Sequence, residues 1–104
     1  MKTAIALVAA LGLGPLGAAA APVDDAMNKA GCMACHSKDK KLVGPAFKEI
    51  AAKYKGQDGV EAKLAEKVRK GGSGVFGPVP MAPNPPDKIN DADLKAAIEL
   101  ILKS

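Results

Sequence analysis

The sequence contains few of the large side chains that usually fill a protein core. There is no tryptophan, and among 104 residues the only aromatic side chains are one tyrosine and two phenylalanines. A small domain buries only a small core, so one with so few rings gains little stability from burial alone. We therefore expect a large apolar cofactor to complete the core, because a group that binds only the folded state stabilises that state.

Potential metal ligands and positive charge are also limited. The chain has two cysteines and one histidine, whereas a structural zinc site usually needs four such ligands. The formal net charge is +4, and the lysines are neither concentrated in one segment nor interleaved with aromatic residues. This distribution gives no support to nucleic-acid binding. The chain also lacks any long alternation of apolar and polar residues, so we expect no β-sheet.

The first 20 residues differ in composition from the rest. Lys2 precedes an apolar run from Ala4 to Leu13, which is followed by a glycine- and proline-containing break and a row of alanines. This order is typical of a secretory signal peptide. The alternative is an uncleaved membrane anchor, but the run is short for a bilayer, which takes about 20 residues, and Gly12, Gly14 and Pro15 interrupt it. We expect cleavage after Ala20, or else after Ala21, which leaves one exported domain at 21–104 without stable membrane insertion.

Helical periodicity and capping residues predict an all-α domain. The predicted helices cover 24–33, 45–54, 60–70 and 90–101, with Pro45 in the first turn of the second helix and Asn90 at the start of the last. Between the last two helices, glycine and proline are too frequent in residues 71–87 for regular structure. A loop of that length in a small domain is usually either functional or disordered. Its apolar residues favour a packed loop; they are Val75, Phe76, Val79 and Met81.

One short motif carries the chemistry. Cys32-Met33-Ala34-Cys35-His36 is a C-x-x-C-H run, which is typical of covalent attachment of a c-type haem. The two thiols form thioethers with the haem vinyl groups, and His36 follows directly as an axial ligand of the iron. A redox-active dithiol, a zinc site and a plain disulfide are the alternatives, and each is less consistent with the rest of the chain.

Two further residues are predicted to complete the environment of the iron. Metal-bound histidines almost always donate their second ring N–H to a carbonyl or carboxylate, and the backbone carbonyl of Pro45 is our candidate. Met81 lies in the glycine- and proline-rich loop and is the methionine placed to reach the opposite face of the haem. A thioether opposite histidine raises the reduction potential, and two strong ligands close the iron to substrates.

These motifs resemble those of class I cytochromes c, specifically the small bacterial monohaem cytochrome c-551/c-552 group. The resemblance implies four or five short helices wrapped around one covalently bound haem c. It also implies that the first and last helices cross, with Met27 and Gly31 near Leu94 and Ile98. The segments that carry the resemblance are 31–36, 43–46, 51–54, 71–77 and 80–84.

The resemblance also implies roles for residues around the ligands. Asn84 would form a hydrogen bond near the Met81 sulfur, and the loop around Phe76 would pack against a haem propionate. Phe76 and Leu100 stand where the group usually has tryptophan, and Ala82 stands where it often has proline. These departures affect the expected potential and the propionate environment but not the iron ligands.

The expected function is electron transfer rather than catalysis. We predict a monomeric periplasmic carrier that docks transiently through an apolar patch ringed by lysines. The resemblance suggests a bc1-type complex as donor, and a nitrite reductase, a terminal oxidase or a haem peroxidase as acceptor. A haem-based sensor or gas-binding module, with Met81 away from the iron, is the alternative, and a fixed haem subunit of a larger enzyme is a third possibility. The predicted patch comprises Met33, Ala34, Val43, Val79 and Met81, and the lysines are Lys29, Lys40 and Lys41.

Overall fold

The computed structural model describes residues 23–104 of the chain, so the predicted signal peptide and its cleavage site lie outside the described residues. Within that range the chain forms five helices and no extended strand, which confirms the all-α prediction. The helices are α1 (Val23–Ala30), α2 (Cys32–Cys35), α3 (Phe47–Tyr54), α4 (Val60–Lys70) and α5 (Asp91–Leu102). None of the helices in residues 23–104 is long and apolar enough to cross a membrane.

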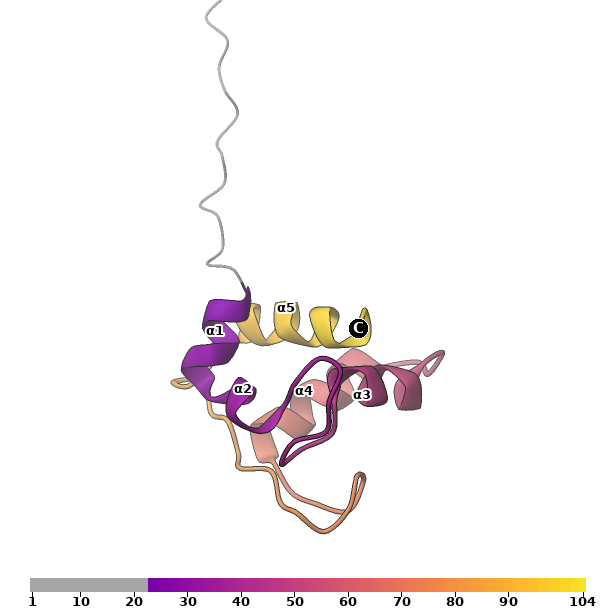
Figure 1. Ribbon diagram of the computed structural model, residues 1–104. Helices are drawn as coiled ribbons and strands as arrows, with labels where there is room; N and C mark the ends of the chain where they lie inside the picture. The colour runs from indigo at the N-terminus through magenta and orange to yellow at the C-terminus, as the bar shows by residue number, and fades with distance from the viewer. Residues whose placement is uncertain (1–22) are drawn as a thin grey trace, which may run out of the picture.

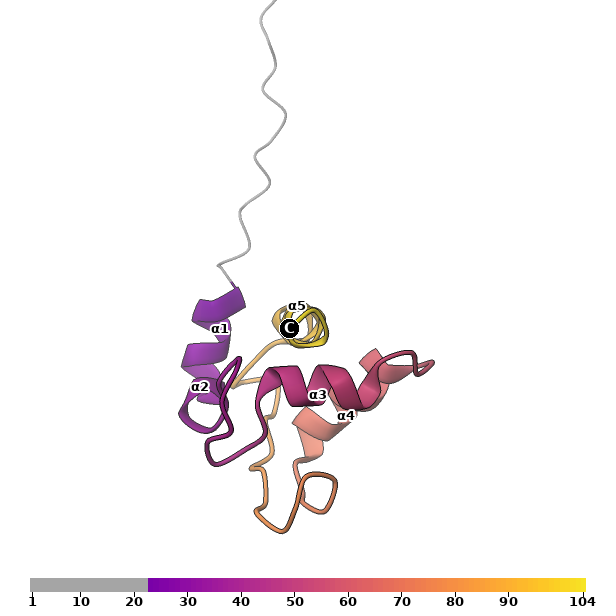
Figure 2. The same ribbon diagram turned by 45° about the vertical axis from the view of Figure 1, so that its right-hand side comes forward.

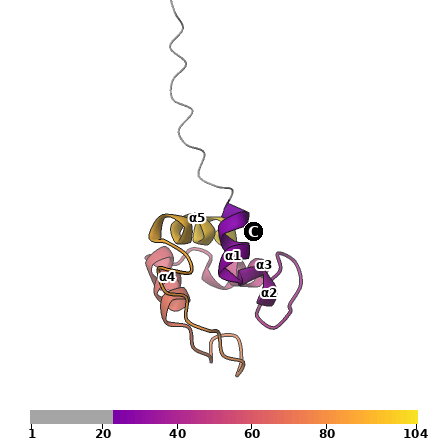
Figure 3. The same ribbon diagram turned by 90° about the vertical axis from the view of Figure 1, so that its left-hand side faces the viewer.

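Helix α5 is the central packing element. It contacts α1, α3 and α4, and Figures 1 and 2 show it at the top of the molecule, with α3 and α4 below it. Figure 3 shows α1 crossing one end of α5. The loop between α4 and α5 extends to the lower end of the molecule in all three views. The helices thus form a scaffold from which α2 and this long loop project.

The core lies where these helices meet. Met27 of α1 and Ile98 of α5 are its largest fully buried side chains, with exposures of 1% and 2%. Met27, Leu94 and Ile98 belong to one apolar cluster, which agrees with the predicted crossing of the first and last helices. Gly31, which was also expected beside Leu94 and Ile98, is exposed, and a Cβ atom on it would meet no other atom within 4 Å. Phe76 and Leu100, the residues at the positions usually held by tryptophan, pack against the edge of the same cluster.

The first predicted helix is shorter than expected. It was expected to continue to Met33, but α1 ends at Ala30, and Gly31 has a left-handed backbone with a φ of 85°. Glycine adopts this conformation without the steric cost that other residues would meet. The reversal at Gly31 separates α1 from α2, so the two cysteines lie on a helical turn with an orientation of its own.

The second predicted helix begins later than expected. Pro45 was expected in its first turn, but α3 begins at Phe47 and Ala46 precedes it with an extended backbone. The first carbonyl that takes part in the helical bonding is that of Ala46, which accepts from the amides of Glu49 and Ile50. The carbonyl of Pro45 is therefore left free for a side chain.

The start of the last helix confirms the predicted capping residue. Asn90 is the N-cap of α5, and its Oδ1 accepts a hydrogen bond of 2.7 Å from the backbone N–H of Asp93. The Nδ2 group of Asn90 also donates to the carboxylate of Asp93, at 3.0 Å. The first of these bonds satisfies a backbone amide that has no partner within the helix.

Candidate haem-binding site

The two cysteines lie on the short helix α2. Both are free thiols and both are half-buried. Burial raises the pKa of the Cys32 thiol, with a smaller contribution from the neighbouring Cys35. Residues 23–104 contain no group of three or more histidine, cysteine or acidic side chains that could hold a metal ion. The free thiols fit covalent attachment of a haem.

His36 is fixed at the end of α2 with one ring nitrogen engaged. Its backbone is extended and its N–H donates to the carbonyl of Cys32 at 3.0 Å. Its Nδ1 lies 2.7 Å from the carbonyl oxygen of Pro45, the partner expected from the sequence. Because a carbonyl can only accept, Nδ1 must carry the proton. The neutral ring then has its lone pair on Nε2, as required for binding iron.

The ring of His36 is also enclosed by neighbours that the sequence analysis had not selected. Phe47 stacks on it with ring centroids 5.6 Å apart and an angle of 23° between the planes. On Gly44, a Cβ atom would lie 2.5 Å from Cε1 of His36, which is too close for any side chain. The Gly44-Pro45 pair was the available signal, since glycine often marks a close approach of the backbone to another group.

Met81 lies in the long loop and is held there by backbone contacts. Its N–H donates to the carbonyl of Gly72 at 2.8 Å, and the N–H of Gly72 donates to the carbonyl of Met81 at 3.0 Å. Gly71 has a φ of 68°, and a Cβ on it would lie 2.3 Å from the Met81 oxygen. The loop therefore returns to the end of α4 at Met81, while the side chain stays half-buried.

Asn84 is the one buried polar residue among those described, at 7% exposure. The resemblance implied a hydrogen bond near the Met81 sulfur. In the structure Nδ2 of Asn84 instead donates to the carbonyls of Ala82 at 3.0 Å and Val68 at 3.3 Å. Both hydrogens of this amide group are therefore used. The Val68 carbonyl is available to Asn84 because the last carbonyls of a helix have no partner within the helix. Asn84 thus fastens the loop to α4.

Phe76 lies in the same loop and is half-buried. The ammonium nitrogen of Lys53, on α3, lies 5.6 Å from the centre of its ring. This is within the range of a cation–π interaction. A phenyl ring has no N–H to offer a propionate, so its predicted role there is limited to packing.

Four residues of the predicted apolar patch are exposed, whereas the fifth, Met81, is half-buried. Met33, Val43 and Val79 are 39%, 55% and 58% accessible to solvent. Leu42 and Val75, which the sequence analysis did not include, are also large exposed apolar residues. The predicted lysines Lys29, Lys40 and Lys41 are all exposed.

Comparisons of the sequence with known proteins all indicate the same family. Residues 20–104 match the family model described as cytochrome c. The chain is 47% identical over 103 residues to cytochrome c-552 of Nitrosomonas europaea, covering 98% of this chain and 97% of that one. It is 57% identical over 76 residues to cytochrome c2 of Rubrivivax gelatinosus, covering 73% and 89% of the two chains.

Comparison with solved structures indicates the same family as the sequence comparisons. The crystal structure of wild-type cytochrome c552 from Nitrosomonas europaea superposes with a TM-score of 0.70 at 46% identity, covering 77% of this chain and 96% of that one. From its fold, its attachment motif and these similarities, the chain belongs to the cytochrome c family, as a small electron carrier of the bacterial c-551/c-552 type with one covalently bound haem c.

Proposed function

We propose that this cytochrome c is a periplasmic one-electron carrier in which Cys32 and Cys35 attach the haem while His36 and Met81 bind its iron. The observation that carries this proposal is the 2.7 Å contact between Nδ1 of His36 and the Pro45 carbonyl. It leaves Nε2 as the nitrogen available to a metal, on a residue that directly follows the two thiols. When bound, the haem supplies an Fe2+/Fe3+ couple.

The chain's own residues tune and protect that couple. The hydrogen bond from His36 to Pro45 fixes the ring and increases the basicity of Nε2. Met81 would supply a thioether, which raises the reduction potential relative to a second histidine. With His36 and Met81 both held for the iron, the chain would leave no open position for an exogenous ligand, so the bound group would supply electron transfer only.

The surface around the site supports transient docking. Complexes between redox proteins usually bury a small interface area, and a mixed apolar and charged surface favours fast but weak association. The exposed side chains of Met33, Val43 and Val79, together with Lys40 and Lys41, fit a partner that presents an acidic ring around an apolar centre. A bc1-type complex as donor, and a nitrite reductase, terminal oxidase or haem peroxidase as acceptor, are the partners we propose.

The deciding experiment is an optical spectrum of the exported protein, oxidised and reduced, with and without carbon monoxide. Ligation by His36 and Met81 predicts a low-spin c-type spectrum, a weak far-red sulfur-to-iron band in the oxidised state and no shift with carbon monoxide. A high-spin spectrum or a ready shift would place Met81 away from the iron and favour a sensor. The intact mass of the same sample tests whether cleavage after Ala20 leaves residues 21–104 plus one haem.

A further inference from the structure

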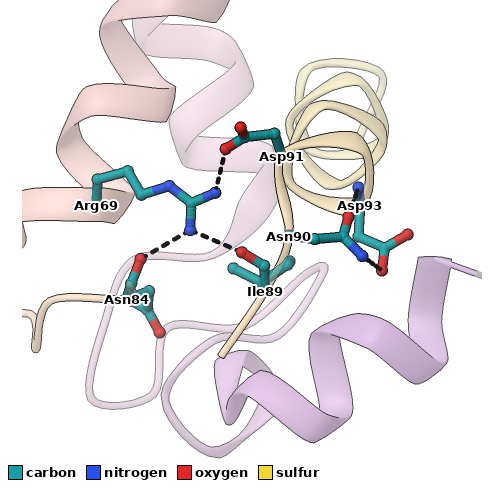
Figure 4. A network of polar contacts seen from close by, with 6 residues as sticks. All are labelled: Arg69, Asn84, Ile89, Asn90, Asp91 and Asp93. Carbon is teal, nitrogen blue, oxygen red and sulfur yellow. Dashed lines mark hydrogen bonds and ion pairs between the residues drawn. The ribbon is translucent and has the colours of Figure 1, made fainter. Parts of the chain in front are cut away.

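Arg69, in the last turn of α4, connects three points of the chain that follow Met81. Its Nη1 donates to the carbonyls of Asn84 at 3.0 Å and Ile89 at 2.7 Å, and its Nη2 lies 2.6 Å from Oδ1 of Asp91. Figure 4 shows the guanidinium between the loop and the start of α5. One side chain therefore joins α4, the end of the long loop and α5.

We expect the hydrogen bonds from Arg69 to the carbonyls of Asn84 and Ile89 to contribute more to holding the loop than the ion pair with Asp91. The Arg69 side chain is only 20% exposed, whereas that of Asp91 is 93% exposed. An ion pair with such an exposed carboxylate contributes little, because water and salt screen it. Hydrogen bonds from a charged donor to shielded carbonyls are stronger. A planar guanidinium serves the three acceptors from two nitrogens in a fixed fork, whereas an ammonium group has a single nitrogen from which to reach them.

These contacts continue a set of bonds that encloses Met81. On one side, Met81 is paired with Gly72 through two backbone hydrogen bonds. On the other side, the backbone N–H of Asn84 donates to Val68 at 3.0 Å, and its side chain donates to the same carbonyl. Arg69 then holds the carbonyl of Asn84. Met81 thus lies on a short span fastened at both ends to the last turn of α4 and the residues just after it.

We propose that Arg69 is a positioning residue for Met81: by clamping Asn84 and Ile89 to α4, it keeps the Met81 thioether on the haem iron. This inference rests on the proposed ligation by Met81. The side chain does not touch the ligand; it restricts the opening of the segment that carries it. Loss of the clamp would let the loop open more often and expose the sixth coordination position to external ligands.

The test uses the haem-loaded protein and two matched variants. Arg69→Gln removes the clamp, and Lys70→Gln makes the same charge change one residue later, on a side chain that is 74% exposed and bonded only to Glu66 of its own helix. Imidazole affinity of the oxidised protein is expected to rise about tenfold in Arg69→Gln, which corresponds to about 1.4 kcal/mol. Exchange of the Asn84 amide, followed by NMR, should accelerate by a similar factor. Lys70→Gln should match the wild type in both.

The outcomes separate this inference from the proposed function. A wild-type spectrum without the far-red band would refute ligation by Met81 and, with it, the role of Arg69. A wild-type band together with unchanged imidazole affinity in Arg69→Gln would refute the role of Arg69 alone. If Arg69→Gln does not accumulate, Arg69→Lys replaces it. Its expected increase is intermediate, because an ammonium keeps the charge but has only one nitrogen from which to reach both carbonyls and the carboxylate. An affinity equal to that of the wild type would overturn the inference.

Discussion

The imidazole of His36 lies so close to the backbone of Gly44 that a methyl group at position 44 would be 2.5 Å from its Cε1 atom. The neighbouring Pro45 carbonyl binds Nδ1 of the same ring, and Phe47 stacks on the ring. Three residues within a span of four therefore set the position of His36. The imidazole cannot turn without breaking a hydrogen bond or meeting the backbone, which fits its proposed role as an iron ligand.

Gly44→Ala is accordingly expected to displace His36. Overpacking of this kind typically costs about 1–3 kcal/mol. We expect a lower free energy of unfolding of the haem-loaded protein and a change in reduction potential, measured by chemical denaturation and by voltammetry. Val43→Ala is the matched control, since Val43 is the adjacent residue and is 55% exposed. Equal effects of the two changes would contradict the close approach of Gly44 to the ring.

Met81→Ala tests the proposed sixth ligand. Removing the thioether should abolish the far-red band of the oxidised protein, lower the reduction potential and allow the reduced protein to bind carbon monoxide. Met33→Ala removes a methionine from the attachment motif, where the side chain is 39% exposed, and should leave all three properties unchanged. Retention of the far-red band in Met81→Ala would show that another group occupies the position.

Ile98→Ala tests the crossing of α1 and α5. Ile98 is 2% exposed and belongs to the same cluster as Met27. Truncation of a buried isoleucine costs about 2–5 kcal/mol, because apolar contacts are lost and a cavity remains. Thermal or denaturant unfolding of the haem-loaded protein measures this loss. Val79→Ala, at a site 58% exposed, should change stability by less than about 0.5 kcal/mol.

Charge reversal tests electrostatic docking. The double variant Lys40→Glu, Lys41→Glu should slow electron transfer to an acidic redox partner by about tenfold at low ionic strength, because steering raises association rates by at least that factor. The difference should disappear as salt is added, since the Debye length falls to about 10 Å at 0.1 M. The double variant Lys95→Glu, Lys103→Glu makes the same charge change on and just after α5. An equal slowing by both variants would refute a docking site around Lys40 and Lys41.

Much of the local structure could be read from the chain. The predicted helix at 60–70 matches α4, because its spacing of apolar residues and its terminal glycines are properties of that segment alone. Asn90 was recognised as a cap for the same reason. The break at Gly31 and the start of α3 at Phe47 were missed. Both depend on where the chain must turn so that His36 can reach Pro45, and no local pattern records that requirement.

The sequence by itself determined the chemistry: two thiols and an imidazole at fixed spacing, a methionine in a long loop, and too few aromatic residues for a core without a cofactor. Residue type and spacing along the chain are sufficient for such inferences. Only the tertiary structure decided how Arg69 and Asn84 fasten the loop to α4, and how Gly44 lies against His36. These contacts join segments that are distant along the chain or depend on close approach of the backbone, so they exist only once the helices have packed.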